Sequence, residues 1–354
     1  MNHILQKFFV IPSIYKGNFV DIDREINAAY QAYPFPWPNE KQYEQYTKED
    51  ALKTLDFFED ALKQFIKQFR LDFSFFKDKV VIDLGAGVGW DAFCLARNGA
   101  KSVYAVDNSG SSVKHGERFA QLLGIPNVKF FQCSLYELDR IGETSDVIIS
   151  KGVLHHIFDL PGFVKALSHI TKDRTQMLLA HSSYSSLMGF IHYFYNHLAW
   201  TLGGADLEKR IDVGVKLFRG WHWQLTDDLL RHRVNDLTGV FYMARSSGQI
   251  MKDFQRGGFL IRKIPGENFM SLYPRLKEHH RQMLEIEKNK PLRKLRRFLA
   301  MGLVETFHVL SLCAPVIDRL LGRIYKFFFS KPAHLFFVQR SPSLKRNDNP
   351  VLVG

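Results

Sequence analysis

The fold of this chain is decided by the stretch VVIDLGAGVGW, which spans Val80–Trp90. It begins with an apolar run of the length of a buried strand, and a loop with alternate glycines follows. Glycine permits a tight turn and lets a ligand approach the backbone, because no Cβ stands in the way. The stretch therefore predicts a β-strand, a glycine loop and the first turn of a helix.

An acid stands at the end of the next apolar run. Asp107 follows Ser102–Val106, and a glycine loop combined with an acid at the tip of the next strand is typical of a nucleoside site in a βαβ unit. A dinucleotide-binding loop would need a glycine at position 90, where this chain has Trp90. The sequence therefore disfavours a nicotinamide or flavin dinucleotide.

The pattern acid-x-Gly-x-Gly-x-Gly, which starts at Asp83, resembles motif I of the class I S-adenosylmethionine (SAM) methyltransferases. In the same family, Asp107 would match the ribose-binding acid and Asp146–Ser150 the fourth strand. Gly152–His156 is similar to the loop after that strand in many small-molecule methyltransferases. The resemblance is specific over about residues 78–182 and looser beyond.

This resemblance implies an α/β, Rossmann-like fold. We expect a seven-stranded sheet in the order 3-2-1-4-5-7-6, flanked by helices, with the last strand antiparallel to its neighbours. The apolar runs place the strands at residues 80–84, 102–107, 128–133, 146–150, 176–181, 259–264 and 334–340.

The rest of the chain divides around this core. Thr47 and Asp50 form a capping-box pattern that predicts the start of an amphipathic helix, and Pro34, Pro36 and Pro38 favour an extended segment before it. By family resemblance, Tyr30 and Tyr33 would be lid residues, although plain capping of the domain explains them equally well. We predict an N-terminal aromatic and proline-rich cover (1–46), a SAM-binding core (47–270) with a substrate-lining segment (182–245), a basic helical insertion between strands six and seven (271–331), the last core strand (332–340) and a tail (341–354).

The resemblance implies SAM as the cofactor and S-adenosylhomocysteine as the product. Asp107 would bind the ribose, and Ser134 and Leu135 stand where the family often has an acid for the adenine amino group. That departure leaves the adenine contact to a serine hydroxyl or a backbone amide. The expected cofactor-binding residues are Asp83, Gly85, Ala86, Gly87, Gly89, Asp107, Asn108, Ser134, Leu135, Lys151 and Gly152.

The loop after the fourth strand holds the candidate bases. His155 and His156 are adjacent, so their side chains point in different directions and at most one of them is expected to be catalytic; packing or capping is the alternative role. His181 is a weaker candidate base. Three residues are expected to position the acceptor, namely Tyr184, Asp236 and Tyr242. For Asp236, a salt bridge to neighbouring arginines is the ordinary alternative.

The cysteines Cys94, Cys133 and Cys313 are scattered and form no C-x-x-C pair. This pattern argues against a disulfide scaffold and a cysteine-rich zinc site, so we expect a reducing cytoplasm and no metal. Met1–Val10 is too short and mixed to be a secretory leader.

The net charge of +12 is concentrated near the end of the sequence. Residues 271–354 carry 16 Lys and Arg against 6 Asp and Glu. A basic run at 288–297 precedes an apolar helix expected at Phe298–Leu312, which predicts peripheral membrane contact through 288–330, a lid over a greasy substrate, or plain packing.

Together these patterns predict a SAM-dependent methyltransferase acting on the oxygen or nitrogen of a small or medium-sized organic acceptor, including lipophilic or natural-product-like compounds. One alternative is an RNA methyltransferase, which only the basic last quarter supports, because the loop after strand four lacks the Asn/Asp-Pro-Pro-aromatic motif. The other is a SAM-binding, membrane-associated protein without turnover, since binding and catalysis are separable. The sequence indicates neither the acceptor nor the oligomeric state.

Overall fold

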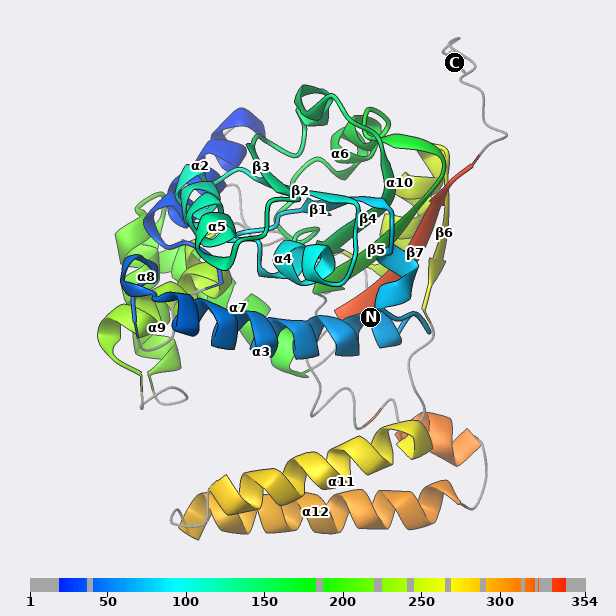
Figure 1. The fold of residues 1–354 in the computed structure, drawn as a ribbon. Helices are drawn as coiled ribbons and strands as arrows, with labels where there is room; N and C mark the ends of the chain where they lie inside the picture. Colours follow the sequence, from blue (N-terminus) through cyan, green and yellow to red (C-terminus); the bar gives the residue numbers. More distant parts are fainter. Residues whose placement is uncertain are drawn as a thin grey trace, which may run out of the picture. The chain divides into compact units, whose positions relative to one another are not determined.

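The chain forms two compact units in the computed structural model (Figure 1). The core unit comprises residues 1–183, 191–264 and 333–354, and the insertion unit comprises 184–190 and 265–332. The structure describes residues 19–36, 41–182, 187–219, 225–240, 245–264, 269–286, 291–312, 316–321, 324 and 333–341.

The core unit is built on a seven-stranded sheet in the order β3-β2-β1-β4-β5-β7-β6. The first five strands are parallel, and β7 lies antiparallel between β5 and β6. This arrangement confirms the sheet that the sequence predicts. The strands are β1 (Val80–Leu84), β2 (Ser102–Asp107), β3 (Val128–Gln132), β4 (Ser145–Lys151), β5 (Thr171–Ser182), β6 (Phe259–Lys263) and β7 (Ala333–Arg340).

Helices cover both faces of the sheet (Figure 1). On one face lie α3 (Lys48–Lys67), α4 (Trp90–Arg97) and α5 (Gly110–Leu123); on the other lie α6 (Leu160–Leu167) and α10 (Ser247–Arg256). Successive strand residues point to opposite faces, so Val81 packs under the first layer and Ile82 under the second. The predicted capping box is present, because Thr47 Oγ1 accepts the Asp50 N–H at 3.2 Å and Asp50 Oδ2 accepts the Thr47 N–H at 2.9 Å.

The glycine loop joins β1 to α4 as predicted. Gly87 has a φ of +55°, and a Cβ there would lie 2.2 Å from the Phe35 carbonyl oxygen. Gly89 has a φ of +87°, and its Cβ would lie 2.7 Å from the Phe130 ring. Both positions therefore require glycine. Trp90 is buried, with its ring 5.9 Å from that of Phe58, so it serves the core.

The N-terminal cover contains a helix that the sequence analysis missed. α2 (Phe19–Ala32) ends before the prolines that favour an extended backbone, so only the residues after it agree with that expectation. Beyond the helix, the Phe35 carbonyl accepts the Val88 N–H at 3.1 Å. Ser109 Oγ donates to the Tyr30 carbonyl at 3.0 Å. The cover is thereby bonded to the glycine loop and to the start of α5.

The segment expected to line the substrate is helical. It contains α7 (Leu187–Gly203), α8 (Leu207–Phe218), α9 (Asp227–Val234) and a π-helical turn at Asn235–Gly239. Ile211, Phe218 and Leu230 form a small apolar core of their own within it. Buried Arg210 donates to the Gly239 carbonyl at 3.0 Å and so holds the π-helical turn against α8.

The insertion unit contains α11 (Phe269–Ile286), α12 (Pro291–Ser311) and helical residues 316–321. The basic run was expected to precede an apolar helix; α12 instead begins at Pro291, so most of the run forms its first turns. Within the described residues, no helix is both long and apolar enough to cross a membrane. Three short 3-10 helices complete the core unit: Tyr43–Gln45, Phe73–Phe76 and Leu138–Ile141.

Candidate active site

The candidate site lies where the carboxyl ends of β1, β2 and β4 meet, because neighbouring parallel strands end at the same edge of a sheet. Ser150 Oγ donates to the Leu84 carbonyl at 3.0 Å and fixes the end of β4 to the end of β1. A Cβ on Gly85 would lie 2.3 Å from Val153 Cγ2, so the loops after the two strands are in contact. The predicted cofactor segments are therefore neighbours in space.

Asp107 bonds directly to the glycine loop. Its Oδ2 accepts the Gly87 N–H at 2.7 Å, and its Oδ1 accepts the Ser109 N–H at 2.9 Å. Burial raises the pKa of Asp107, although these backbone N–H groups act in the opposite direction. The carboxylate thus stands beside the loop at the tip of β2, which is where a ribose-binding acid is expected.

Asp83 is a buried carboxylate with one oxygen unsatisfied. Its side chain is 4% exposed, and Oδ2 accepts no hydrogen bond from the part of the chain that the structure describes. Burial and then the nearby Asp91 raise the pKa of Asp83 well above its usual value, against the opposing charge of Lys151. A buried charge is costly unless it is paired, so this position suits a cationic ligand group such as an ammonium.

Lys151 and Gly152 follow β4. The Lys151 ammonium pairs with Asp91 at 2.5 Å, in the first turn of α4. Gly152 has a φ of +72°, and its N–H donates to the Ala180 carbonyl at 3.2 Å. On the other side of the loop, the Ala86 N–H donates to the Val106 carbonyl at 3.0 Å. These contacts leave backbone, rather than long side chains, at the junction of the loops.

Asp23 on α2 reaches the position where the sequence lacks an acid. Its Oδ2 accepts a hydrogen bond from Asn108 Nδ2 at 3.4 Å, and its carboxylate also bonds to the Ser134 side chain. Burial raises the pKa of Asp23. Leu135 instead packs into the apolar core. Sequence reasoning missed Asp23 because α2 itself was not expected, and no motif marks the residue.

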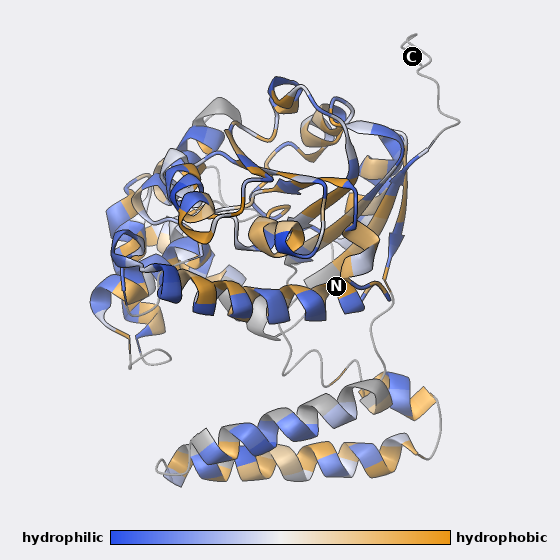
Figure 2. Ribbon diagram, viewed as in Figure 1, coloured by the Kyte–Doolittle hydropathy of each residue, from blue (hydrophilic) through white to orange (hydrophobic). Residues whose placement is uncertain are grey.

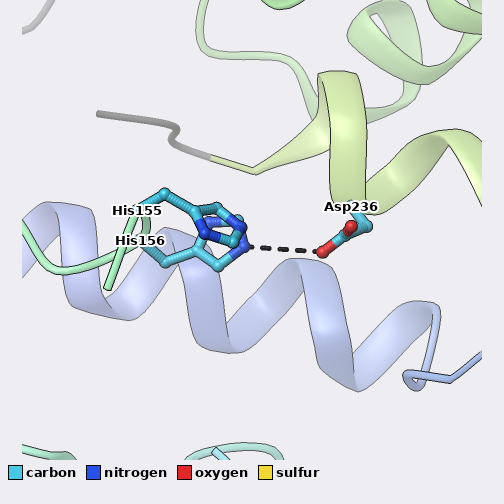
Figure 3. Close-up of side chains that lie close together, drawn as sticks. All are labelled: His155, His156 and Asp236. Atoms are coloured by element: carbon cyan, nitrogen blue, oxygen red, sulfur yellow. Dashed lines mark ion pairs between the residues drawn. The ribbon is translucent and has the colours of Figure 1, made fainter. Parts of the chain in front are cut away.

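A cluster of polar groups joins three distant segments, and Figure 3 shows two of its members, His156 and Asp236. The Tyr30 hydroxyl, from α2, donates to Asp236 Oδ1 at 2.7 Å and lies 3.1 Å from His156 Nε2. His156 Nε2 is also 3.4 Å from Asp236 Oδ1. Asp236 belongs to the π-helical turn, and His156 to the loop after β4. The structure thus brings together two predicted catalytic residues and one predicted lid residue.

The electrostatics of this cluster favour an ionised Asp236. Burial alone would raise the pKa of Asp236, but contacts with His156, Tyr30 and Arg233 outweigh it and lower the pKa below its usual value. Burial and the Asp236 charge raise the pKa of Tyr30 well above its usual value, so the phenol stays protonated. The group therefore offers a carboxylate that can stabilise a positively charged imidazole.

His155 lies behind His156. It is 3% exposed, and its ring centroid is 4.0 Å from that of His156 and 6.3 Å from that of His181. Burial, and then the charges of His156, His181 and Arg245, lower the pKa of His155 well below its usual value. Of the two adjacent histidines, His156 is the one whose Nε2 lies 3.4 Å from Asp236 Oδ1.

His155, His156 and Asp236 also lie close enough together to share a metal ion, since one ligand atom from each falls within 4.8 Å of the others. Two of these residues, His156 and Asp236, already bond to the Tyr30 hydroxyl. His156 and Asp236 thus already have a hydrogen-bond partner inside the cluster, and we do not assign a metal to it.

Arg245 is a further residue that the sequence analysis missed. Its buried guanidinium donates to the Leu154 carbonyl at 3.0 Å and to the Phe158 carbonyl at 2.7 Å. Burial lowers the pKa of Arg245 to about 10. The residue clamps both ends of the loop that carries His155 and His156, so it sets the position of these side chains.

Three further candidates are not part of the described cluster. Tyr184 and Tyr242 are outside the described residues. The Tyr33 hydroxyl donates to Glu208 at 3.1 Å and accepts from Arg231 at 3.2 Å, so it belongs to an ion-pair network rather than to the Tyr30 cluster. Arg231 pairs with Asp212 at 2.6 Å, not with Asp236.

Comparison with known proteins agrees with this geometry. The family described as "Methyltransferase domain" matches residues 75–209. The chain is 28% identical over 118 residues to the uncharacterized methyltransferase YcgJ of Bacillus subtilis, which covers 33% of this chain and 46% of that protein. It is 28% identical over 100 residues to the ubiquinone biosynthesis O-methyltransferase of Methylocella silvestris, which covers 28% of this chain and 38% of that protein. The chain thus spans less than half the length of these curated relatives.

The chain is also similar to the crystal structure of YcgJ from Bacillus subtilis. The TM-score is 0.41 at 15% identity, and the match covers 75% of this chain and 93% of that one. The match over residues 75–209 and the order of the strands agree with the sheet that the sequence predicts.

Proposed function

We propose that the protein transfers a methyl group from SAM to an oxygen or nitrogen of a small organic acceptor, on the basis of the match of residues 75–209 to the methyltransferase domain family. The observation that carries this proposal is the hydrogen-bonded cluster of Tyr30, His156 and Asp236 beside the cofactor loops. The chain's similarity to an O-methyltransferase of ubiquinone biosynthesis supports a small-molecule acceptor.

The proposed cofactor site uses acids from three segments. Asp83, whose Oδ2 is buried and unsatisfied within the described chain, would bind the amino group of the methionine end. Asp107 would accept hydrogen bonds from the ribose hydroxyls. Asp23 lies beside Asn108 and Ser134. It would accept a hydrogen bond from the adenine amino group, a role for which the segment after β3 has no acid. A cationic ligand suits this acidic surrounding, because SAM carries both an ammonium and a sulfonium.

SAM, when bound, supplies an activated methyl group, so the protein's own work is to align the acceptor, exclude water and remove a proton. His156 is the proposed base. Asp236 would stabilise the imidazolium that forms, and the Tyr30 hydroxyl would orient both groups through its short contacts. His155, held neutral by burial, packs behind His156 and fixes its ring.

Titration calorimetry of the purified full chain with SAM and with S-adenosylhomocysteine tests the cofactor site. One molecule of either should bind per chain, and Asp107→Ala should weaken binding about tenfold or more, as expected for losing charge-assisted hydrogen bonds. The matched control is Asp60→Ala, an exposed acid on α3. A folded wild-type chain that takes up neither molecule would overturn the proposal.

Transfer itself can be followed with methyl-labelled SAM and an acceptor panel. The panel should contain dihydroxyphenols with and without a long alkyl chain, primary amines, and a short unmodified RNA. Label in a phenol or amine supports the proposal. Label in RNA alone would favour the alternative of an RNA methyltransferase, and cofactor binding without transfer to an extract of cellular metabolites would favour a binding protein.

A further inference from the structure

Helix α12 exposes large apolar side chains in its first turns and again near its end. Leu292 is 82% exposed, Leu295 55%, Phe298 68% and Leu299 63%. Along the rest of α12 and the residues after it, the exposed apolar side chains continue with Val309, Leu310, Leu312, Val316 and Leu320. Figure 2 shows hydrophobic and hydrophilic segments alternating along this helix. Scattered apolar residues are normal on a surface, but a group of this size marks an interaction site.

The exposed leucines of the first turns lie on a different side of α12 from the residues that pack. Leu292, Leu295 and Leu299 follow the spacing i, i+3, i+7 and so share one face of the helix. Val304 and Phe307 belong instead to the small core that includes Tyr273 of α11. At 3.6 residues per turn, Val304 falls about 120–180° around the helix from the three leucines, and Phe307 falls about 60–120° from them. Packing within the insertion unit therefore uses a different part of the helix surface and leaves the leucines uncovered.

Charge distinguishes what this face would bind. The first turns of α12 contain Arg293, Lys294, Arg296 and Arg297 and no acid. The only acid of the helix, Glu305, accepts a hydrogen bond from Tyr273 at 2.7 Å and pairs with Lys277 at 3.0 Å, so its charge is matched from α11. Over the whole insertion unit, 13 Lys and Arg stand against 6 Asp and Glu. The surroundings of the exposed apolar side chains are thus strongly basic.

We propose that the exposed face of α12 docks onto the surface of an anionic lipid bilayer, with the helix lying in the plane of the interface. A helix with large apolar residues on one face and several basic residues beside it is typical of interfacial binding. Basic side chains near the headgroups add electrostatic attraction to acidic lipids. A buried protein interface is less well matched, because charged residues are depleted from the centre of such interfaces.

This docking deepens the proposed function, on which its consequence for the substrate rests. A chain attached to a bilayer can meet acceptors that are dissolved in the lipid, whereas a chain in water cannot extract them without cost. The inference therefore favours the lipophilic members of the proposed acceptor class, such as phenols that carry a long alkyl chain.

Sedimentation of the full chain with vesicles tests the proposal. The wild type should bind vesicles of phosphatidylcholine plus phosphatidylglycerol and bind phosphatidylcholine alone more weakly. Added salt should weaken only the part of vesicle binding that depends on the anionic lipid. Salt screens charges but does not affect the insertion of apolar side chains. Phe298→Glu and Leu299→Glu should each lower the partition coefficient by about tenfold or more, since a buried apolar side chain is replaced by a charge.

The core unit supplies matched controls. Phe57 on α3 is 67% exposed and Leu202 on α7 is 64% exposed, so Phe57→Glu and Leu202→Glu make the same chemical change at the same exposure. Both should bind vesicles like the wild type. Because Phe298 and Leu299 project into solvent, their variants should stay folded and bind SAM normally, which separates a failure of docking from a failure of the proposed function.

Three outcomes would overturn docking to lipid. The first is unchanged sedimentation of the Phe298 and Leu299 variants. The second is a stable dimer of the wild type in the absence of vesicles that these same substitutions dissociate, which would assign the face to a second copy of the chain. The third is tight RNA binding that competes with vesicles and that the apolar substitutions leave intact.

Discussion

The hydroxyl of Tyr30 donates a 2.7 Å hydrogen bond to Asp236, a residue 206 positions away in sequence, and the same oxygen lies 3.1 Å from His156. This contact links the N-terminal helix to the π-helical turn after α9. It makes the helix α2 part of the site rather than a passive cover. The consequences of this and other contacts can be measured.

Tyr30→Phe should leave cofactor binding nearly unchanged and lower the rate of methyl transfer about a hundredfold, the lower end of what a positioned proton-transfer group contributes. The phenyl ring keeps its edge-on packing against His156, so only the hydroxyl is lost. Removing a hydrogen bond to a charged group should also cost about 1.5–3 kcal/mol in the free energy of unfolding. Steady-state kinetics with an acceptor that becomes labelled in the panel experiment measure the rate, and urea unfolding measures the stability. An unchanged kcat would show that the hydroxyl plays no part in transfer.

Gly87→Ala should destabilise the protein and abolish SAM binding. Gly124→Ala should bind SAM normally and lose only the small amount of stability that backbone strain costs. Both glycines have positive φ, +55° and +70°, so alanine is strained at each. Only at Gly87 would the Cβ meet an atom, the Phe35 oxygen at 2.2 Å; nothing lies within 4 Å at Gly124. Overpacking of this kind costs about 1–3 kcal/mol. Equal unfolding energies for the two variants would contradict the close contact between the cover and the loop.

Asp23→Asn should weaken SAM binding by about 1–2 kcal/mol, because one partner of a charge-assisted hydrogen bond is removed. The sharper readout is selectivity. The wild type should prefer S-adenosylhomocysteine over its inosine analogue, in which a carbonyl replaces the adenine amino group, and Asp23→Asn should remove most of that preference. Calorimetry with both ligands measures it. If the variant discriminates as well as the wild type does, Asp23 does not contact the base.

Arg245→Met should lower the free energy of unfolding by about 1–3 kcal/mol, since it removes the donor from the buried Leu154 carbonyl and from the part-buried Phe158 carbonyl. The backbone of residues 152–158 should then exchange its amide hydrogens faster than in the wild type. Hydrogen-exchange mass spectrometry checks this against α3, whose protection should fall only by the global amount. Arg245→Lys, which can reach one carbonyl, should give an intermediate result.

Stability should fall with decreasing pH partly because of His155. Burial lowers the pKa of this histidine well below 6.5 in the folded chain, whereas the unfolded chain takes up a proton near that value. The unfolded state therefore binds more protons at low pH. His155 has no effect on the pH dependence of stability above about pH 6.5. Below that pH it lowers the free energy of unfolding by up to about 1.4 kcal/mol for each pH unit.

His155→Gln should flatten this dependence between about pH 6.5 and about pH 5, as measured by urea unfolding at several pH values. His115 and His232 also have lowered pKa values, but they are present in both proteins and cancel in the comparison. Parallel curves for the two proteins would mean that His155 can protonate in the folded chain.

The sheet could be predicted because its signals are local. A strand, a glycine loop and a helix follow one another within Val80–Arg97, and each apolar run is marked by its own residues. The family resemblance then supplied the order of the strands. The position of Asp107 could be predicted for the same reason, because it is the last residue of a strand.

The contacts of α2 and Arg245 could not be predicted. Asp23 and Tyr30 form hydrogen bonds with residues far along the chain, and a single sequence does not indicate such pairings. Arg245 bonds only to backbone carbonyls, which leave no trace in the sequence of the loop that it holds. The histidine pair was visible, but which histidine meets Asp236 depends on side-chain direction.

The longer segment of the insertion unit, residues 265–332, joins two strands that already lie side by side. β6 pairs with β7 in antiparallel register, with Lys263 opposite Phe336 near the point where the insertion begins and ends. An ordinary hairpin turn could join the same two ends without altering the order of the sheet. The addition is therefore modular: evolution, or a protein engineer, could shorten, exchange or transplant it while the catalytic scaffold keeps its topology.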